Sequence, residues 1–171
     1  MDEQAAESPT PTKVTAFGIQ NARPFTDLPP GQLVAGRIGK HPFIGLSGGD
    51  DQGAMFVVFN NGEGGMQVVD RDAIDPPDPI EAELVIEPIE AKDAFHLAEA
   101  GRGDPALLVS EDGRFGLSIP FKRYGQTARI NVDLATGLLF KAKRVLSLTG
   151  VKLSLRQEGR KDLMEIARIG G

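Results

Sequence analysis

Ser47 stands in a stretch of sequence that could make it a nucleophile. It is the centre of GLSGG (45–49), which matches the Gly-x-Ser-x-Gly turn that presents the catalytic serine of many hydrolases. That turn works only where a strand passes sharply into a helix, because this geometry exposes the hydroxyl. Here DDQG follows, which predicts a turn and then another strand. We therefore assign no catalytic role to Ser47.

The two histidines offer little further chemistry. His41 precedes Pro42 in an expected loop, and His96 lies beside Phe95 on an expected helix. Neither has a second histidine at the spacing of a zinc pair, and the chain has no cysteine. We therefore expect no catalytic residue, no metal and no cofactor. Hydrolysis by a pair of carboxylates stays open, because such partners meet only in the fold.

One connector is crowded with aspartates that have the chemistry to bind Ca²⁺: Asp70, Asp72, Asp75 and Asp78. The EF-hand loop requires a glycine at its sixth position and a glutamate at its twelfth. Counted from Asp70, the sixth residue is Asp75 and the twelfth is Glu81, so the glycine is missing. A solvated acidic loop is the expectation.

The distribution of charge is the most unusual feature of the chain. Residues 1–121 hold 8 Lys/Arg and 20 Asp/Glu, whereas residues 122–171 hold 11 and 4, so an acidic part precedes a basic one. Such separation favours charged interaction surfaces. The acidic interaction region is expected at Asp70, Asp72, Asp75, Asp78, Glu81 and Glu83. The basic interaction face is expected at Lys122, Arg123, Tyr124, Arg129, Lys141, Lys143, Lys152 and Arg156.

Strand alternation predicts where the positive charge points. In the expected strands 127–134, 138–146 and 151–156, apolar and charged side chains alternate, so each strand has an apolar and a basic face. Phe140 falls on the face away from its neighbouring lysines, which leaves Tyr124 as the exposed aromatic residue. If the three strands are neighbours, five cations cover one sheet face: Arg129, Lys141, Lys143, Lys152 and Arg156.

Composition indicates which elements must position these residues. The 171 residues include 21 glycines and 12 prolines, and so many breakers suit short strands joined by turns. Apolar spacing predicts one short helix near residues 90–100, ending at Gly101. Strands are expected at 13–20, 32–38, 54–60, 66–70, 80–87, 106–110, 115–119, 127–134, 138–146, 151–156 and 162–169, and a short helix is the alternative for the last of these.

The expected fold is therefore mainly β, sandwich- or barrel-like, with the short helix between two β-rich halves, 14–89 and 106–171. These halves form a single domain, 14–171, preceded by an extended arm over residues 1–13, which have no large apolar side chain after Met1. A short internal repeat in the sequence also favours two β-rich halves. GLS at 45–47 precedes QGAMFVV, and GLS at 116–118 precedes QTARINV. A three-residue match arises easily by chance; if it is real, the halves are two similar β units.

The sequence favours a non-catalytic structural or interaction subunit of a larger assembly, virion-like or another multisubunit particle. Its acidic and basic surfaces would complement one another between subunits, and the arm would dock. The alternative is a module for single-stranded DNA or RNA that uses a basic sheet face in residues 122–160. The ordinary alternative is that the opposite charges pair within one chain. Without a recognisable signal peptide or an apolar run of membrane length, a cytoplasmic location, or a particle assembled there, is expected.

Overall fold

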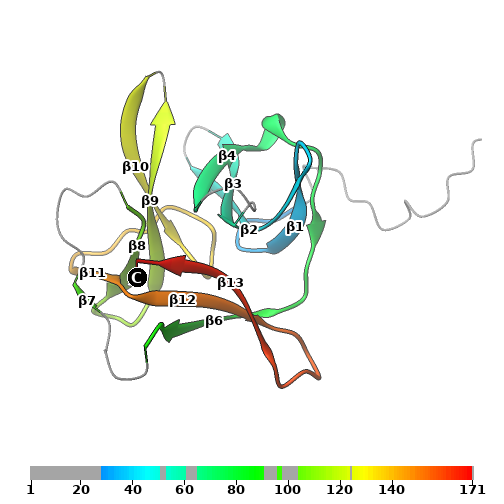
Figure 1. Ribbon diagram of the computed structural model, residues 1–171. Coiled ribbons are helices and arrows are strands. Elements are labelled where there is room, and N and C mark those ends of the chain that lie inside the picture. The colour runs from blue at the N-terminus through cyan, green and yellow to red at the C-terminus, as the bar shows by residue number, and fades with distance from the viewer. Residues whose placement is uncertain are drawn as a thin grey trace, which may run out of the picture.

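The protein is mainly β, which confirms the expected β-rich, sandwich-like fold class (Figure 1). The computed structural model describes residues 28–50, 53–60, 65–90, 96–97, 104–123 and 125–170, with the backbone alone described at 50, 96, 97, 122 and 123. Over these residues it has three antiparallel sheets, one short 3₁₀ turn, η2 (Arg71–Ala73), and no α-helix. No helix in this described part is long and apolar enough to cross a membrane.

Sheet A contains the first five strands in the order β4-β3-β2-β1-β5. Strand β2 pairs antiparallel with β1 and β3, β3 also pairs antiparallel with β4, and β5 returns to pair with β1. Their bounds are β1 (Leu33–Ile38), β2 (His41–Asp50), β3 (Gly53–Asn60), β4 (Gln67–Asp70) and β5 (Asp78–Pro79).

Sheets B and C contain the remaining strands. Sheet C has the order β10-β9-β8-β11-β7, and sheet B has the order β13-β12-β6. Sheet C is formed by β7 (His96–Leu97), β8 (Ala106–Ser110), β9 (Phe115–Arg123), β10 (Gln126–Asp133) and β11 (Val145–Thr149). Sheet B is formed by β6 (Glu83–Pro88), β12 (Val151–Arg156) and β13 (Leu163–Ile169).

Sheets A and C repeat one pairing pattern, which places the two GLS segments at matching positions. Leu46 of the first segment pairs with Val57, and Leu117 of the second pairs with Val132. Strand β11 returns to pair with β8 as β5 returns to pair with β1. The short sequence repeat therefore marks equivalent strands. We refer to β1–β6 as the first repeat and to β8–β12 as the second repeat.

The last strands of the two repeats, β6 and β12, pair with each other. Leu84 lies opposite Leu155 and Ile86 opposite Leu153, and all four pack against the same core. Because the two strands are counterparts and run antiparallel, this pair is locally two-fold symmetric. Strand β13 then pairs with the outer side of β12, whereas in the described part of the chain β6 has no neighbour on its outer side.

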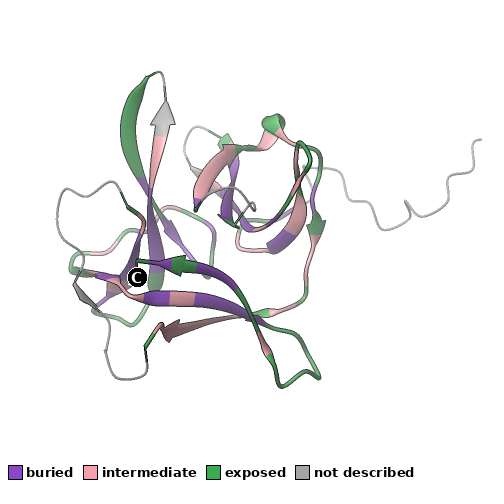
Figure 2. Ribbon diagram, viewed as in Figure 1, coloured by how far each residue is buried: buried purple, intermediate pink, exposed green. Residues whose placement is uncertain are grey.

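Two apolar cores hold the sheets. The main core draws on all three, and its most buried members include Leu46, Leu107, Leu117 and Leu153, each at most 1% exposed (Figure 2, purple). The second core lies on the other face of sheet A and contains Leu28, Val34, Phe43, Phe56 and Val58. Sheet A is thus buried on both faces, which stabilises it as a framework.

The expected helix at 90–100 is wrong at His96–Leu97. These two residues form β7, which pairs with Leu148 and Thr149 of β11. The edge of β11 offers backbone partners there, and such tertiary pairing overrides the helical spacing of a few alanines. Residues 91–95 and 98–100 of that range lie outside the described residues, as do the arm 1–13 and the strand expected at 13–20.

Two further strand predictions are corrected by the structure. The range His41–Asp50, expected as loop and turn because its proline and glycines suppress the usual strand signal, forms β2, the longest of the described strands. Pairing on both sides, with β1 and β3, overrides this. The strand expected at 138–146 is wrong in its middle. Only Leu139 forms a bridge, to Val132, and β11 begins at Val145.

The repeat predicts the same effect of substitution at two equivalent glycines, Gly45 and Gly116. A β-carbon at Gly45 would lie 2.5 Å from the carbonyl oxygen of Val57, and one at Gly116 would lie 2.6 Å from the Phe140 ring. Alanine at either position should lower the free energy of unfolding by about 1–3 kcal/mol, because it overpacks the site. Gly49→Ala is the control, since its nearest neighbour would lie 3.7 Å away. Urea denaturation measures all three, and equal stabilities would contradict the alignment of the repeats.

Candidate functional site

The hairpin of β9 and β10 is longer than its counterpart in the first repeat. Leu117 and Val132 are paired across 15 positions of sequence, whereas Leu46 and Val57 are paired across 11. The second hairpin therefore carries four additional residues, two on each strand. The pairs nearest its tip are Lys122–Thr127 and Arg123–Gln126. Part of the positive charge predicted to form an interaction face thus lies in the extension.

The distal part of this hairpin projects from the body of the protein. Residues 126–129 are all exposed, whereas Ile130 is buried and Phe121 is partly buried against the main core (Figure 2). Beyond that point the two strands form a ribbon with no described sheet against it (Figure 1). An isolated two-stranded ribbon is marginally stable in water. Such a ribbon is therefore suited to pair or pack with something outside the chain.

Arg129 fixes the base of the ribbon. Its Nε donates to Ser118 Oγ at 2.9 Å, and its Nη2 donates to the carbonyl oxygens of Asp104 at 2.8 Å and Ser118 at 3.2 Å. These bonds join β10 to β9 and to the segment before β8. Arg129 therefore contributes its charge to the hairpin from a fixed position.

The outer face of sheet C is the face away from the main core. Residues at equivalent positions of the two repeats show that this face differs chemically from the outer face of sheet A. In the first repeat this face is the second core. Asn131 and Asp133 occupy the places of Phe56 and Val58, since each pair lies opposite the serine and glycine of its GLS segment. An apolar core face in one repeat is thus a polar face in the other, on which Asn131 is exposed and Asp133 is buried.

Arg114, which directly precedes β9, contacts several groups on that outer face. Its guanidinium lies 5.3 Å from the centre of the Phe140 ring and donates to the carbonyl oxygen of Lys141 at 2.6 Å. It also lies 3.6 Å from the carboxylate of Asp133, which is only 3% exposed. Asp133 accepts hydrogen bonds from the backbone N–H groups of residues 135–136 at 2.9 and 3.0 Å. The buried charge is therefore paired and hydrogen-bonded, as burial requires.

The turn between β8 and β9 adds a hydrogen-bonded carboxylate. The hydroxyl of Ser110 donates to Asp112, and Arg114 Nε lies 3.0 Å from the same carboxylate. The hydrogen bond from Ser110, with a smaller contribution from the Arg114 charge, lowers the pKa of Asp112 below its ordinary value of 3.8. This arrangement holds the turn and leaves the guanidinium over Phe140.

The structure does not bring the predicted basic face together on one sheet. Arg129 lies in sheet C, Lys152 and Arg156 lie in sheet B, and Lys141 and Lys143 lie between strands. The alternation in β10 and β12 is as expected, with their apolar residues buried. The backbones of residues 122–123 lie at the hairpin tip, and their side chains and Tyr124 are outside the described part of the chain.

Two cations of sheet B pair with carboxylates on the neighbouring strand. Arg156 Nη1 lies 3.0 Å from Glu83, and Lys152 Nζ lies 3.6 Å from Glu87. Arg156 and Glu83 come from the two predicted interaction surfaces, so part of their charge is balanced within the chain. The other acidic residues are all exposed around β4, η2 and β5: Asp70, Asp72, Asp75, Asp78 and Glu81.

Ser47 has a structural role. It lies in β2, is 3% exposed, and its hydroxyl donates to the carbonyl oxygen of Pro29 at 2.5 Å and accepts from the N–H of Gln32 at 3.0 Å. These bonds fasten the segment before β1 to sheet A. Among the described residues, no group of three or more histidines, aspartates or glutamates is arranged to hold a metal ion.

Sequence reasoning missed the hairpin extension and the pair of Arg114 with Asp133. A signal for the extension was present, because QTARINV follows its GLS segment at a greater distance than QGAMFVV does. The ion pair had no such signal, since Arg114 precedes β9 and Asp133 ends β10. No family model matches the sequence, and no curated protein or solved structure matches it either.

The pKa of Asp112 gives a direct test of the turn. Ser110→Ala should raise this pKa towards 3.8, because the hydrogen bond to the carboxylate is lost. A lowered folded-state pKa stabilises the fold above the unfolded-state pKa, and this contribution disappears as the pH falls through the folded-state pKa. The variant should therefore be less stable than the wild type at neutral pH, with a smaller difference in acid. NMR titration of the carboxyl carbon measures the shift, with Ser147→Ala as control. An unchanged Asp112 titration in Ser110→Ala would rule the hydrogen bond out.

Proposed function

We propose that this protein is a non-catalytic assembly subunit that docks through the β9–β10 hairpin. The observation that carries the proposal is the extension of this hairpin relative to its counterpart in the same chain. Two repeats with the same pairing need the same framework for stability. Four residues added to one of them, Lys122, Arg123, Gln126 and Thr127, of which the last two are described as exposed, are not needed for that framework.

The partner that fits is the acidic region of a second copy. In the view of Figure 1, β9 and β10 project upward on the left, and the acidic segment that follows β4 lies to the right of them. A basic surface and an acidic surface at different places favour head-to-tail contact between copies, which builds rings or filaments. Opposite charges would steer encounter and fix the register of such contacts.

The nucleic-acid alternative has weaker support. Binding single strands without sequence preference relies on aromatic side chains on which bases stack. Phe140 lies on the outer face of sheet C but is only 8% exposed and is covered by Arg114. No exposed aromatic residue lies on that face of the described chain. A protein carboxylate surface therefore suits these cations better than a run of bases.

A shortened hairpin tests the proposal. Deleting Lys122, Arg123, Gln126 and Thr127 removes two complete pairs and connects residues 124–125 directly to Phe121 and Ala128, which are already paired. The variant should keep the strand spectrum and urea midpoint of the wild type but lose self-association at low salt, measured by sedimentation velocity. The double reversal Lys122→Glu with Arg123→Glu should weaken association about tenfold or more, because a loss of about 1.4 kcal/mol of binding free energy raises the Kd tenfold.

The control changes charge equally at another exposed turn. Arg160→Glu with Lys161→Glu alters residues between β12 and β13, and association should be nearly unaffected. A wild-type protein that stays monomeric at every concentration and salt would contradict the proposal. Tight, salt-sensitive binding of oligonucleotides that is lost in the shortened hairpin would instead support the alternative.

A further inference from the structure

Sheet B is occupied on one side and open on the other. Strand β13 covers the outer edge of β12, and within the described residues no strand covers the outer edge of β6. Because β6 and β12 are counterparts, the place beside β6 corresponds to the place that β13 fills. The fold therefore contains one strand position that is used in the second repeat and unused in the first.

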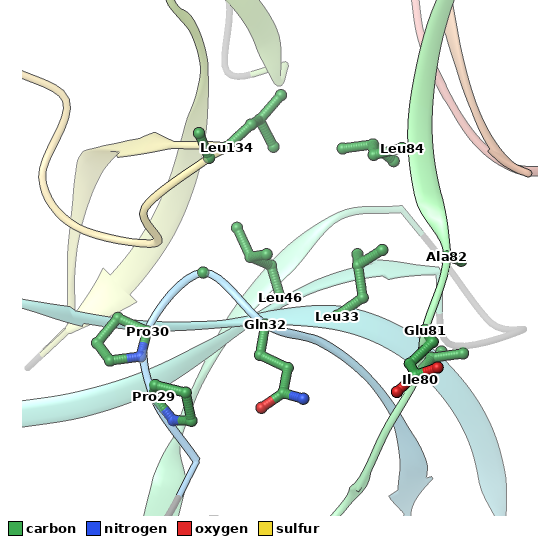
Figure 3. Close-up of a pocket in the computed structure, with 12 residues that line it drawn as sticks. Pro29, Pro30, Gln32, Leu33, Leu46, Ile80, Glu81, Ala82, Leu84 and Leu134 are labelled. Carbon is green, nitrogen blue, oxygen red and sulfur yellow. The ribbon is translucent and has the colours of Figure 1, made fainter.

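The unused position opens onto a cleft between the two repeats. The cleft has a volume of about 460 Å³ and an apolar floor formed by Leu33, Leu46, Leu84 and Leu134. Figure 3 shows Leu84 extending from β6 towards Leu134, with Leu33 and Leu46 beneath. The Gln32 amide, whose Oε1 is buried and has no hydrogen-bond partner among the described residues, points away from these leucines (Figure 3).

The matching place in the second repeat is closed by β13. Ala167 and Ile169 of β13 lie opposite Leu153 and Val151 of β12, and all four belong to the main core. Leu153 and Val151 are fully buried there. By contrast Leu84, the counterpart of Leu153, is only partly buried. The cleft is thus the space that two apolar side chains of an added strand would fill.

The backbone of β6 is prepared for such a strand. The N–H of Ile89 donates to the carbonyl oxygen of Gly150 on the β12 side. Since bonding directions alternate along an antiparallel strand, the N–H and C=O groups of Leu84 and Ile86 point to the outer edge. No described strand pairs with them there. They form a short template for strand addition.

The charge beside this edge is negative. Glu83 and Glu87 lie on the face of β6 away from the core, and Glu81 lines the cleft. Lys152 and Arg156 compensate two of these carboxylates from the β12 side, but no cation is described on the outer side of β6. An incoming strand would place its own outward side chains next to Glu83 and Glu87, where lysine or arginine fits best.

We infer that β6 accepts an extended strand from a protein partner, in which apolar residues alternate with lysine or arginine. The apolar residues enter the cleft over Leu84, as the side chains of β13 cover Leu153. The basic residues face Glu83 and Glu87, and the backbone pairs with Leu84 and Ile86. This site is distinct from the β9–β10 hairpin and does not depend on the function proposed above.

A peptide experiment on the full chain tests the inference. The probe is an eight-residue peptide of alternating lysine and valine, compared with one of alternating glutamate and valine and with a block peptide of four lysines followed by four valines. The alternating lysine peptide should bind at least about tenfold more tightly than either control, because only it matches both period and charge. It should also slow hydrogen exchange at the N–H groups of Leu84 and Ile86.

Matched variants locate the binding. Ala135 is exposed and lines the cleft, so Ala135→Trp should block entry without disturbing the core and weaken the peptide about tenfold or more. Thr136→Trp changes the neighbouring exposed residue, which does not line the cleft, and should bind as the wild type does. Shortening the β9–β10 hairpin should leave peptide binding unchanged, which separates the two sites.

Three results would overturn the inference. The first is equal binding of the alternating and block peptides, or no effect of Ala135→Trp. The second is protection of the Leu84 and Ile86 N–H groups in the dilute protein without peptide, because the chain's own residues would then occupy the edge. The third is protection that rises with protein concentration, because the occupant would then be a second copy.

Discussion

The shared apolar core between the two repeats is the constraint on which the rest of the structure depends. Leu46 and Leu117 occupy matching places in it, and β6 and β12 close it by pairing with each other. Burying one leucine side chain contributes about 1.5–3 kcal/mol, so a core supplied by three sheets outweighs the weak local preferences of a glycine-rich chain. The same core explains why sheet A and sheet C must keep the same register. On the opposite face of each strand, a side chain at Gly45 or Gly116 would meet the neighbouring strand or the Phe140 ring, and glycine is required there for that separate reason.

With the framework fixed by this core, the differences between the repeats indicate where function lies. The second repeat has a longer hairpin and a polar outer face held by Arg114 and Asp133. The first repeat has no strand beside β6 among the described residues, and a cleft lies there. Neither difference improves the packing of the core. One offers positive charge on a projecting ribbon, and the other offers an apolar groove with negative charge at its edge, so the two suit different partners.

Strands with clear alternation could be predicted from the sequence, and those without it could not. In β10 and β12 the burial of Ile130 and Leu153 follows the period of two. Strand β2 could not be predicted, because Pro42 and its glycines suppress the signal and only pairing on both sides makes it a strand. The basic face was inferred from alternation within strands, and it required a neighbour relation between β10 and β12 that alternation does not contain. Which strands become neighbours is decided by long-range pairing, and so the candidate site emerged only from the fold.

The central claim, that both repeats depend on one core, is tested most directly by hydrogen exchange followed through a urea titration. Peptides from β2–β3 and from β9–β10 should lose protection with the same midpoint and slope, because breaking the shared core exposes both sheets at once. Substituting Leu46 by alanine should lower both midpoints together, by the equivalent of about 2–5 kcal/mol. Two separate transitions, with only the first repeat shifted by the substitution, would show that each repeat has its own core and contradict the account.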